Sequence, residues 1–382
     1  MSIRDISCPS EHRIFFDECV KRIFSWGFLW EMGTNKSKGD LMDTIVKWQQ
    51  KLVPDLLNMM AGRYRILHAV SLLQPIGRRM LSSHLGVTER VLRSEASFLA
   101  DQGLISMATT GMQLTSDGER LLEALDEVMN DVLGIPQLEE QLRHKLNLAK
   151  VVVVPGDSDE QPWVKNDLGL ATVKVMDALA KDQSIIAVTG GTTMASVAQM
   201  MHPLKKGHHL VFVSARGGLG EQVDNQANTI CAKMAEKADG SYRLLHVPDQ
   251  LSEEAFNTLI GEPSIQDVLK LIQSADIIVH AIGDALTMAK RRKATDVMLE
   301  KIERAKAVAE TFGYYFNREG QVVHKVKTFG LQLENLFEDR NVISLAGGRS
   351  KAKAIEAYFK EGPQSILVTD EGAARELLKN VT

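Results

Sequence analysis

The chain has 382 residues, of which 44% are hydrophobic and 25% are charged, and its formal net charge is −4. This length is enough for two or three domains, and the composition is ordinary for a soluble globular protein. The acidic balance excludes a generally basic nucleic-acid coat. Any DNA binding must therefore come from a local cluster of cations.

The three cysteines, Cys8, Cys19 and Cys231, are far apart and form no C-x-x-C pair. This usage indicates a reducing compartment, the cytoplasm, and predicts neither a disulfide framework nor a metal site. Cys231 falls in an amphipathic helical stretch at 227–238, where a core thiol is favoured over a nucleophile.

The first 41 residues match no helical or strand pattern that continues into the next element. Residues 14–30 are rich in aromatics but carry four charges, so they are too short and too polar to span a bilayer. They also lack the features of a signal peptide. Residues 38–42 can be encoded by a purine-rich run followed by ATG, which leads to the hypothesis that 1–41 are an upstream extension and that Met42 is the native start.

Residues 42–115 carry the pattern of a winged helix-turn-helix. A helix beginning at Pro54 breaks at 74–77, and two short helices at 78–85 and 89–102 flank the turn Gly86-Val87-Thr88. Strands at 104–107 and 112–114 are expected to form the wing. The residues predicted to contact DNA share an exposed, polar position on these helices: Arg78, Arg79, Thr88, Arg90, Arg93 and Ser94. The alternative is an ordinary three-helix subdomain with solvated arginines.

Residues 116–150 are expected to be linker helices. One apolar stripe runs from Leu121 to Leu133, and Gly134-Ile135-Pro136 interrupts the helical pattern. The stripe fits a buried core face and a dimer seam equally well.

From residue 151 to 382, apolar strands alternate with helices. The predicted strands are 151–154, 185–189, 210–214, 243–247, 277–281, 342–345 and 366–369, with a hairpin at 314–323. Continuous apolar runs are typical of strands buried on both faces, so the pattern predicts a mostly parallel sheet covered by helices, an α/β fold.

Ligands of such sheets bind beyond the carboxyl ends of the strands. Three glycine-rich loops are expected to meet there: Thr189-Gly190-Gly191-Thr192-Thr193, the run 214–220 with Arg216, and the run 347–351 with Arg349 and Lys351. Bare amides at a helix N-terminus bind phosphate, and a lysine on a first helical turn is unfavourable unless an anion lies beside it. Two separate cationic loops fit a ligand with two anionic groups.

The winged helix-turn-helix, the loops at 188–193, 215–221 and 346–352, and Asn225-Gln226-Ala227-Asn228-Thr229-Ile230 together resemble the sorbitol-operon (SorC) family of regulators, whose sugar-binding domain is also described as DeoR-like. The similarity covers Met42 to near the C-terminus. It implies an effector domain similar to ribose-phosphate isomerases and glucosamine-phosphate deaminases, with a Rossmann-like sheet.

The resemblance also implies a repressor of the operon for the triose-phosphate steps of glycolysis, induced by fructose 1,6-bisphosphate. Gly190, Gly191, Thr192 and Thr193 would bind one phosphate, Arg216 and Lys351 would contact phosphates, Gln226 and Glu310 would meet the sugar, and Gly217, Gly218 and Leu219 would complete the site. Arg349 stands where the family motif has a small residue.

Two other functions are weighed against this one. A sugar-phosphate isomerase or deaminase would need an acid and a base beside the glycine loops, and the sequence offers no convincing pair there. A DNA-architecture protein without a ligand leaves the cationic loops unexplained. The expected partners are therefore double-stranded operator DNA, a phosphorylated sugar and further copies of the chain as a dimer or tetramer, with no cofactor and no membrane.

Overall fold

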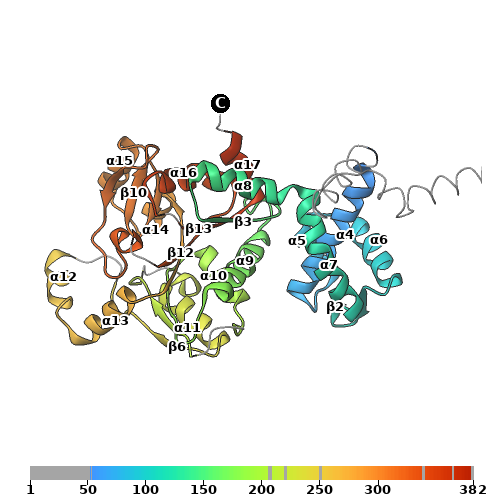
Figure 1. Ribbon diagram of the computed structural model, residues 1–382, viewed down its shortest axis with the longest axis horizontal. Coiled ribbons are helices and arrows are strands. Elements are labelled where there is room, and N and C mark those ends of the chain that lie inside the picture. The colour runs from blue at the N-terminus through green and yellow to red at the C-terminus, as the bar shows by residue number, and fades with distance from the viewer. Residues whose placement is uncertain are drawn as a thin grey trace, which may run out of the picture. The chain divides into compact units, whose positions relative to one another are not determined.

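The computed structural model describes residues 52, 54–204, 209–218, 222–248, 252–337, 340–363 and 365–379 (Figure 1). Within it, Asn58–Thr382 forms one compact unit. The proposed extension at 1–41 and the proposed start at Met42 lie outside the described residues.

The N-terminal part of this unit is a winged helix-turn-helix, as predicted. Its elements are α4 (Pro54–Leu73), α5 (Arg78–Leu85), α6 (Glu89–Asp101), β1 (Ile105–Ala108) and β2 (Gly111–Leu114). Gly86 ends α5 in the left-handed region at φ 64°, and the Thr88 hydroxyl caps α6 by accepting the Val91 amide at 3.4 Å. Leu81, Leu92 and Leu99 are fully buried between these helices.

Two helices follow the wing, α7 (Ser116–Leu133) and α8 (Ile135–Leu146), and Gly134 joins them at φ 71°. In the apolar stripe of α7, Leu122 and Met129 are buried whereas Leu121 is exposed. The described part of the stripe therefore supplies core contacts and leaves some apolar surface open.

A seven-stranded parallel sheet forms the centre of the C-terminal part. Its order is β3-β13-β12-β7-β4-β5-β6, and its strands are β3 (Lys150–Val154), β4 (Ile185–Val188), β5 (Val211–Ser214), β6 (Ser241–Arg243), β7 (Ile277–Ala281), β12 (Asn341–Leu345) and β13 (Ile366–Asp370). The predicted α/β fold class is confirmed.

Helices cover both faces of this sheet (Figure 1). One face packs against α9 (Val164–Leu179), α10 (Thr192–Met200) and α11 (Ala227–Lys237), and the other against α8, α13 (Pro263–Gln273), α16 (Ala352–Glu361) and α17 (Glu371–Lys379). In β7, Ile277 and Val279 lie in the apolar core between the sheet and α9, α10 and α11. Ile278 lies in the core on the opposite face, with α8, α13, α16 and α17. This alternation explains why the buried strands are apolar at most successive positions.

A second, antiparallel sheet of order β11-β10-β9-β8 lies beyond β7 in the chain. It contains β8 (Gly283–Asp284), β9 (Ala307–Thr311), β10 (Tyr314–Asn317) and β11 (Val322–Lys325), and α14 (Ala285–Arg291), α15 (Asp296–Arg304) and α16 pack against it. The short helix α12 (Glu253–Leu259) precedes α13. The hairpin predicted at 314–323 is confirmed as β10–β11. The sequence gives no sign of β8 or β9.

The strand predicted at 243–247 is wrong, because β6 ends at Arg243. The neighbouring strand β5 ends at Ser214, so the ladder offers no further partner. The side chain of Asn228 instead hydrogen-bonds both backbone groups of Leu245, at 3.2 and 3.1 Å. A buried extended segment is thereby satisfied without a strand.

A histidine lies in the middle of the central sheet. His280 of β7 is fully buried, and its ring nitrogens lie 2.8 Å from the Ser344 hydroxyl, 3.1 Å from the Tyr358 hydroxyl and 3.1 Å from the Thr311 hydroxyl. Burial lowers the pKa of His280 to about 3. The ring is therefore neutral in the folded protein at every ordinary pH.

This histidine should make stability fall with acidity. The unfolded chain takes up a proton near pH 6.5 and the folded chain does not, so the stabilisation is complete above that pH and is lost as the pH falls toward 3. We expect His280 to lower the free energy of unfolding by about 2 kcal/mol at pH 5 relative to neutral pH. In equilibrium urea unfolding, His280→Gln should lose this slope and His144→Gln, at an exposed position, should keep it. An unchanged slope in His280→Gln would refute the assignment.

Candidate functional site

The carboxyl ends of the central strands border a cavity of about 230 Å³. A larger cavity of about 560 Å³ lies elsewhere, between α4, β3, α9 and α17. The smaller one is the candidate ligand site because the loops after β4, β5 and β12 and the N-terminus of α10 all reach it.

The loop after β4 forms one wall of this cavity. Gly191 precedes α10 at φ 118°, a conformation that side chains rarely adopt, and its amide donates to the Asn225 carbonyl at 2.9 Å. At Gly190, a Cβ would lie only 2.7 Å from the same carbonyl. Both glycines are therefore needed for this turn, which leads directly into Thr192 and Thr193 at the positive end of α10.

Arginines and a glutamate form a buried charged group on another wall. Arg216, in the loop after β5, is 6% exposed, and its guanidinium lies 3.9 Å from Glu310 of β9, which is 3% exposed. Glu310 also accepts from Arg292 at 2.8 Å and from the Gly313 amide at 2.6 Å. One carboxylate thus faces two guanidiniums in a buried place, where charges interact strongly.

Lys351 ends the loop after β12. It lies on the short 3-10 turn Arg349–Lys351 before α16, and burial lowers its pKa, while Asp284 raises it and Arg291 lowers it. Because burial disfavours the charged form of Lys351, an anion bound beside it would favour that form.

A buried carboxylate holds this loop. Asp370, at the end of β13, accepts the Gly348 amide at 2.6 Å and the Ser158 amide at 2.9 Å on one oxygen, and the Ala373 amide at 2.9 Å on the other. Burial raises the pKa of Asp370, whereas the amide hydrogen bonds lower it. Asp370 therefore fixes the loop before Lys351 to the loop after β3.

The structure brings together most of the residues predicted to bind the effector. Those that line the cavity are Gly190, Gly191, Thr192, Thr193, Arg216, Gly217, Gln226, Glu310 and Lys351. Gly218 does not line it; its amide donates to the Val247 carbonyl at 2.9 Å. Leu219 lies outside the described residues.

Arg349, expected among the pocket cations, does not line this cavity. Its guanidinium lies 2.8 Å from Asp157 and 3.1 Å from Glu160, and it borders the larger cavity. Arg349 lies at the larger cavity because the loop after β3 places the carboxylates of Asp157 and Glu160 there.

Three cations of the pocket were not predicted: Lys165 on α9, Arg291 on α14 and Arg292 directly after it. The run Lys290-Arg291-Arg292-Lys293 is typical of a solvated helix end, so only the fold shows which of its members turn inward. With them, five cationic side chains and two carboxylates, Asp159 and Glu310, line the cavity. An anion pocket on a chain of net charge −4 is the simplest explanation.

The predicted DNA-contacting residues occupy one part of the fold. Arg78 and Arg79 begin α5, Thr88 caps α6, and Arg90, Arg93 and Ser94 lie on α6; all six are exposed. Arg79 lies 3.3 Å from Glu89 across the turn. The second helix of the motif thus offers unobstructed guanidiniums, as a recognition helix requires.

Two sequence families match the chain in its two parts. Residues 59–129 match the CggR N-terminal DNA-binding domain, and residues 130–379 match a sugar-binding domain family. The fold and the matched domains define a DNA-binding transcription regulator with a sugar-binding domain.

Relatives of known name agree with this class. The central glycolytic genes regulator of Priestia megaterium is 56% identical over 340 residues, which cover 89% of this chain and 99% of that protein. The regulator of the same name from Bacillus subtilis is 52% identical over 339 residues, 89% of this chain and all of that protein.

Solved structures agree as well. A SorC family transcriptional regulator from Enterococcus faecalis is 48% identical, with a TM-score of 0.60 over 63% of this chain and 99% of that one. The full-length sorbitol operon regulator from Klebsiella pneumoniae, at 17% identity, shares the fold with a TM-score of 0.60 over 90% of this chain and 100% of its own.

The chain belongs to the SorC family of sugar-binding transcriptional regulators. It is a regulator and not an enzyme, so the isomerase alternative is set aside. Within the described residues, no helix is both long and apolar enough to cross a bilayer.

The glycine loop gives a direct prediction. Gly190→Ala places a methyl group 2.7 Å from the Asn225 carbonyl, so the loop must shift and its amides must leave their positions. We expect calorimetry with a sugar bisphosphate to show affinity lower by about tenfold or more, the equivalent of one charge-assisted hydrogen bond. Gly261→Ala, whose Cβ would be 3.8 Å from its nearest neighbour, should bind normally. Wild-type affinity in Gly190→Ala would contradict this role of the loop.

The recognition helix α6 gives a second testable prediction. Arg93→Ala should weaken operator binding by about 1–3 kcal/mol if the guanidinium reads a base, or lower the salt slope by about 0.9 if it contacts a phosphate. Fluorescence anisotropy at several salt concentrations separates these cases. Arg304→Ala, an exposed arginine on α15, is the matched control and should bind as wild type. If Arg93→Ala also binds as wild type at every salt concentration, α6 does not read DNA through this residue.

Proposed function

We propose that this regulator represses the operon for the triose-phosphate steps of glycolysis and that fructose 1,6-bisphosphate releases it from the operator. The observation that carries the proposal is the excess of cationic over acidic side chains among the described residues that line the cavity, together with the glycine loop that leads into α10. Two relatives named central glycolytic genes regulator, 56% and 52% identical over nearly their whole length, support the choice of operon.

The residues that line the pocket suggest which of them bind each of the two phosphates. One phosphate accepts from the amides of Thr192 and Thr193 and from Lys351, where the α10 N-terminus adds a favourable dipole. The second pairs with Arg216, which lies 3.9 Å from Glu310. Gln226 and Glu310 meet the hydroxyls of the sugar between them. A neutral sugar would form no ion pair with these cations and should bind weakly.

At the DNA end, Arg78, Arg79, Thr88, Arg90, Arg93 and Ser94 form the operator-contacting surface. The protein acts in the cytoplasm as a homo-oligomer, a dimer or tetramer on paired half-sites, because a single short recognition helix reads few base pairs. Release requires that the effector bind the DNA-free state more tightly than the DNA-bound state, since equal affinity would shift nothing.

A mobility-shift titration tests the proposal. DNA from upstream of the triose-phosphate genes should be bound by the full chain, and fructose 1,6-bisphosphate should release it, whereas glucose and inorganic phosphate at equal concentration should not. An identical DNA affinity with and without the bisphosphate would reject the proposed control.

Lys351 provides the matching variant. Lys351→Met keeps the length of the side chain and removes its charge, so the affinity for fructose 1,6-bisphosphate should fall by roughly 10- to 150-fold, the value of a charge-assisted hydrogen bond of about 1.5–3 kcal/mol. Lys353→Met, exposed two residues further on, should bind normally. Equal affinities of the two variants in calorimetry would exclude Lys351 from the site.

A further inference from the structure

The segment between β3 and α9 has two sides. Ser158 and Asp159 line the ligand cavity, and Asp159 accepts the amide of Ser350 at 2.8 Å and its hydroxyl at 3.1 Å. The Asp370 carboxylate ties Ser158 to Gly348 as well. A ligand that draws Lys351 toward itself therefore acts on this segment through several hydrogen bonds.

A few residues further on, the same segment contacts the winged helix-turn-helix. The indole of Trp163 lies 5.7 Å, centroid to centroid, from the ring of His84 on α5. On the next turn, Asp167 of α9 lies 3.6 Å from Nδ1 of His68 on α4. Leu85, at the end of α5, packs against the core that contains Trp163. Three contacts within a short stretch thus join the two domains.

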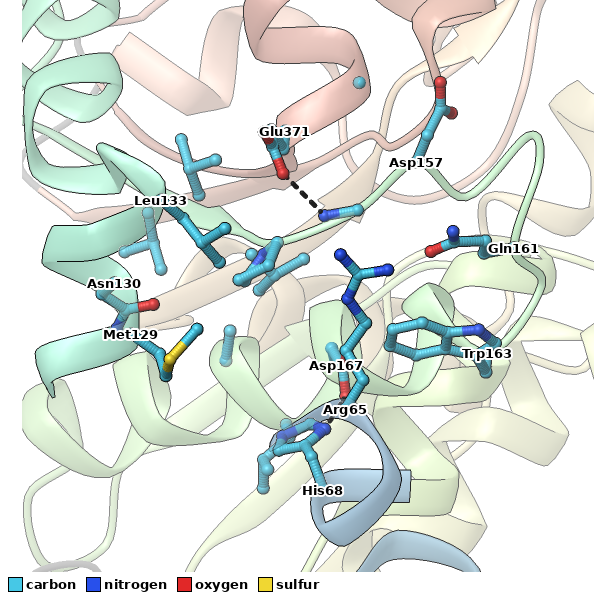
Figure 2. A pocket seen from close by; sticks show the side chains of 18 of the residues that line it. Arg65, His68, Met129, Asn130, Leu133, Asp157, Gln161, Trp163, Asp167 and Glu371 are labelled. Carbon is cyan, nitrogen blue, oxygen red and sulfur yellow. Dashed lines mark hydrogen bonds and ion pairs between the residues drawn. The ribbon is translucent and has the colours of Figure 1, made fainter. Parts of the chain in front are cut away.

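This contact is not a closed, fully packed interface. Beside it lies the cavity of about 560 Å³, bounded by α4, α7, β3, α9 and α17. Figure 2 shows Arg65 of α4 extending into it, between Trp163 and Glu371. Trp163 is 7% exposed, and its indole N–H has no hydrogen-bond acceptor among the described residues. Unfilled space and an unsatisfied buried donor both favour an interface that can rearrange.

We propose that residues 156–167 transmit ligand occupancy from the strand-end pocket to the DNA-reading domain, through the Trp163–His84 and Asp167–His68 contacts. The inference rests on the proposed function, because it supplies the path by which the effector changes operator affinity. The two states that the ligand distinguishes then differ in how α4 and α5 sit on this segment.

The test measures coupling in the full chain. Operator affinity is determined without ligand and with saturating fructose 1,6-bisphosphate, and the ratio is the coupling factor. Asp167→Asn and His68→Gln should bind the bisphosphate within about twofold of wild type, yet their coupling factors should be about 2- to 30-fold smaller. The double variant should lose no more than the larger single loss, because both changes remove one contact. Glu300→Gln, which breaks an exposed ion pair on α15, should couple like wild type.

The outcomes separate the two claims. Wild-type coupling in both interface variants would overturn the inference and leave the proposed function intact. A coupling factor of one in the wild-type chain would overturn both. Trp163 gives an independent measurement that needs no change in the ion pair: the bisphosphate should alter tryptophan emission in the wild-type chain and not in Trp163→Phe. An emission change of equal size in Trp163→Phe would show that the ligand does not reach this contact.

Discussion

The arrangement of the ligand site depends on one buried carboxylate. Asp370 accepts amide hydrogens from Ser158 and Gly348, which belong to loops almost 200 residues apart in the chain. The loop after β12 passes close to both carboxylates. A Cβ on Gly347 would lie 2.8 Å from Asp370, and a Cβ on Gly348 would meet Asp159. Together with the bonds from Ser350 to Asp159, this carboxylate fixes the loop before Lys351 to the segment that leads to Trp163.

A second constraint is the charge inside the pocket. Among the described residues, five cationic side chains but only two carboxylates, Glu310 and Asp159, line the cavity, and Arg216 and Arg292 are buried there. Such an arrangement is costly in an empty site and becomes favourable once an anion enters. The fold tolerates the cost of these buried charges because the rest of the sheet is buried in two apolar cores, which stabilise it.

Much of this could be read from the sequence, for identifiable reasons. Continuous apolar runs located six of the seven parallel strands, and the turn residues at 86–88 located the recognition helix. The strand at 243–247 was misplaced because Asn228 satisfies Leu245 in place of a ladder, a long-range contact that no local pattern reveals. Arg291 and Arg292 were missed because their run is indistinguishable from a solvated helix end until α14 is placed against the pocket. Arg349 was expected in the pocket, whereas Asp157 and Glu160 draw it to the other side.

The central claim is that a doubly anionic metabolite lies at the carboxyl edge of the parallel sheet. A crystal structure of the chain grown with fructose 1,6-bisphosphate tests it most directly. We expect one phosphate on the amides of Thr192 and Thr193, within hydrogen-bond distance of Lys351, and the other beside Arg216. Density for the bisphosphate in the larger cavity next to Trp163, with the strand-end pocket free of it, would contradict the account.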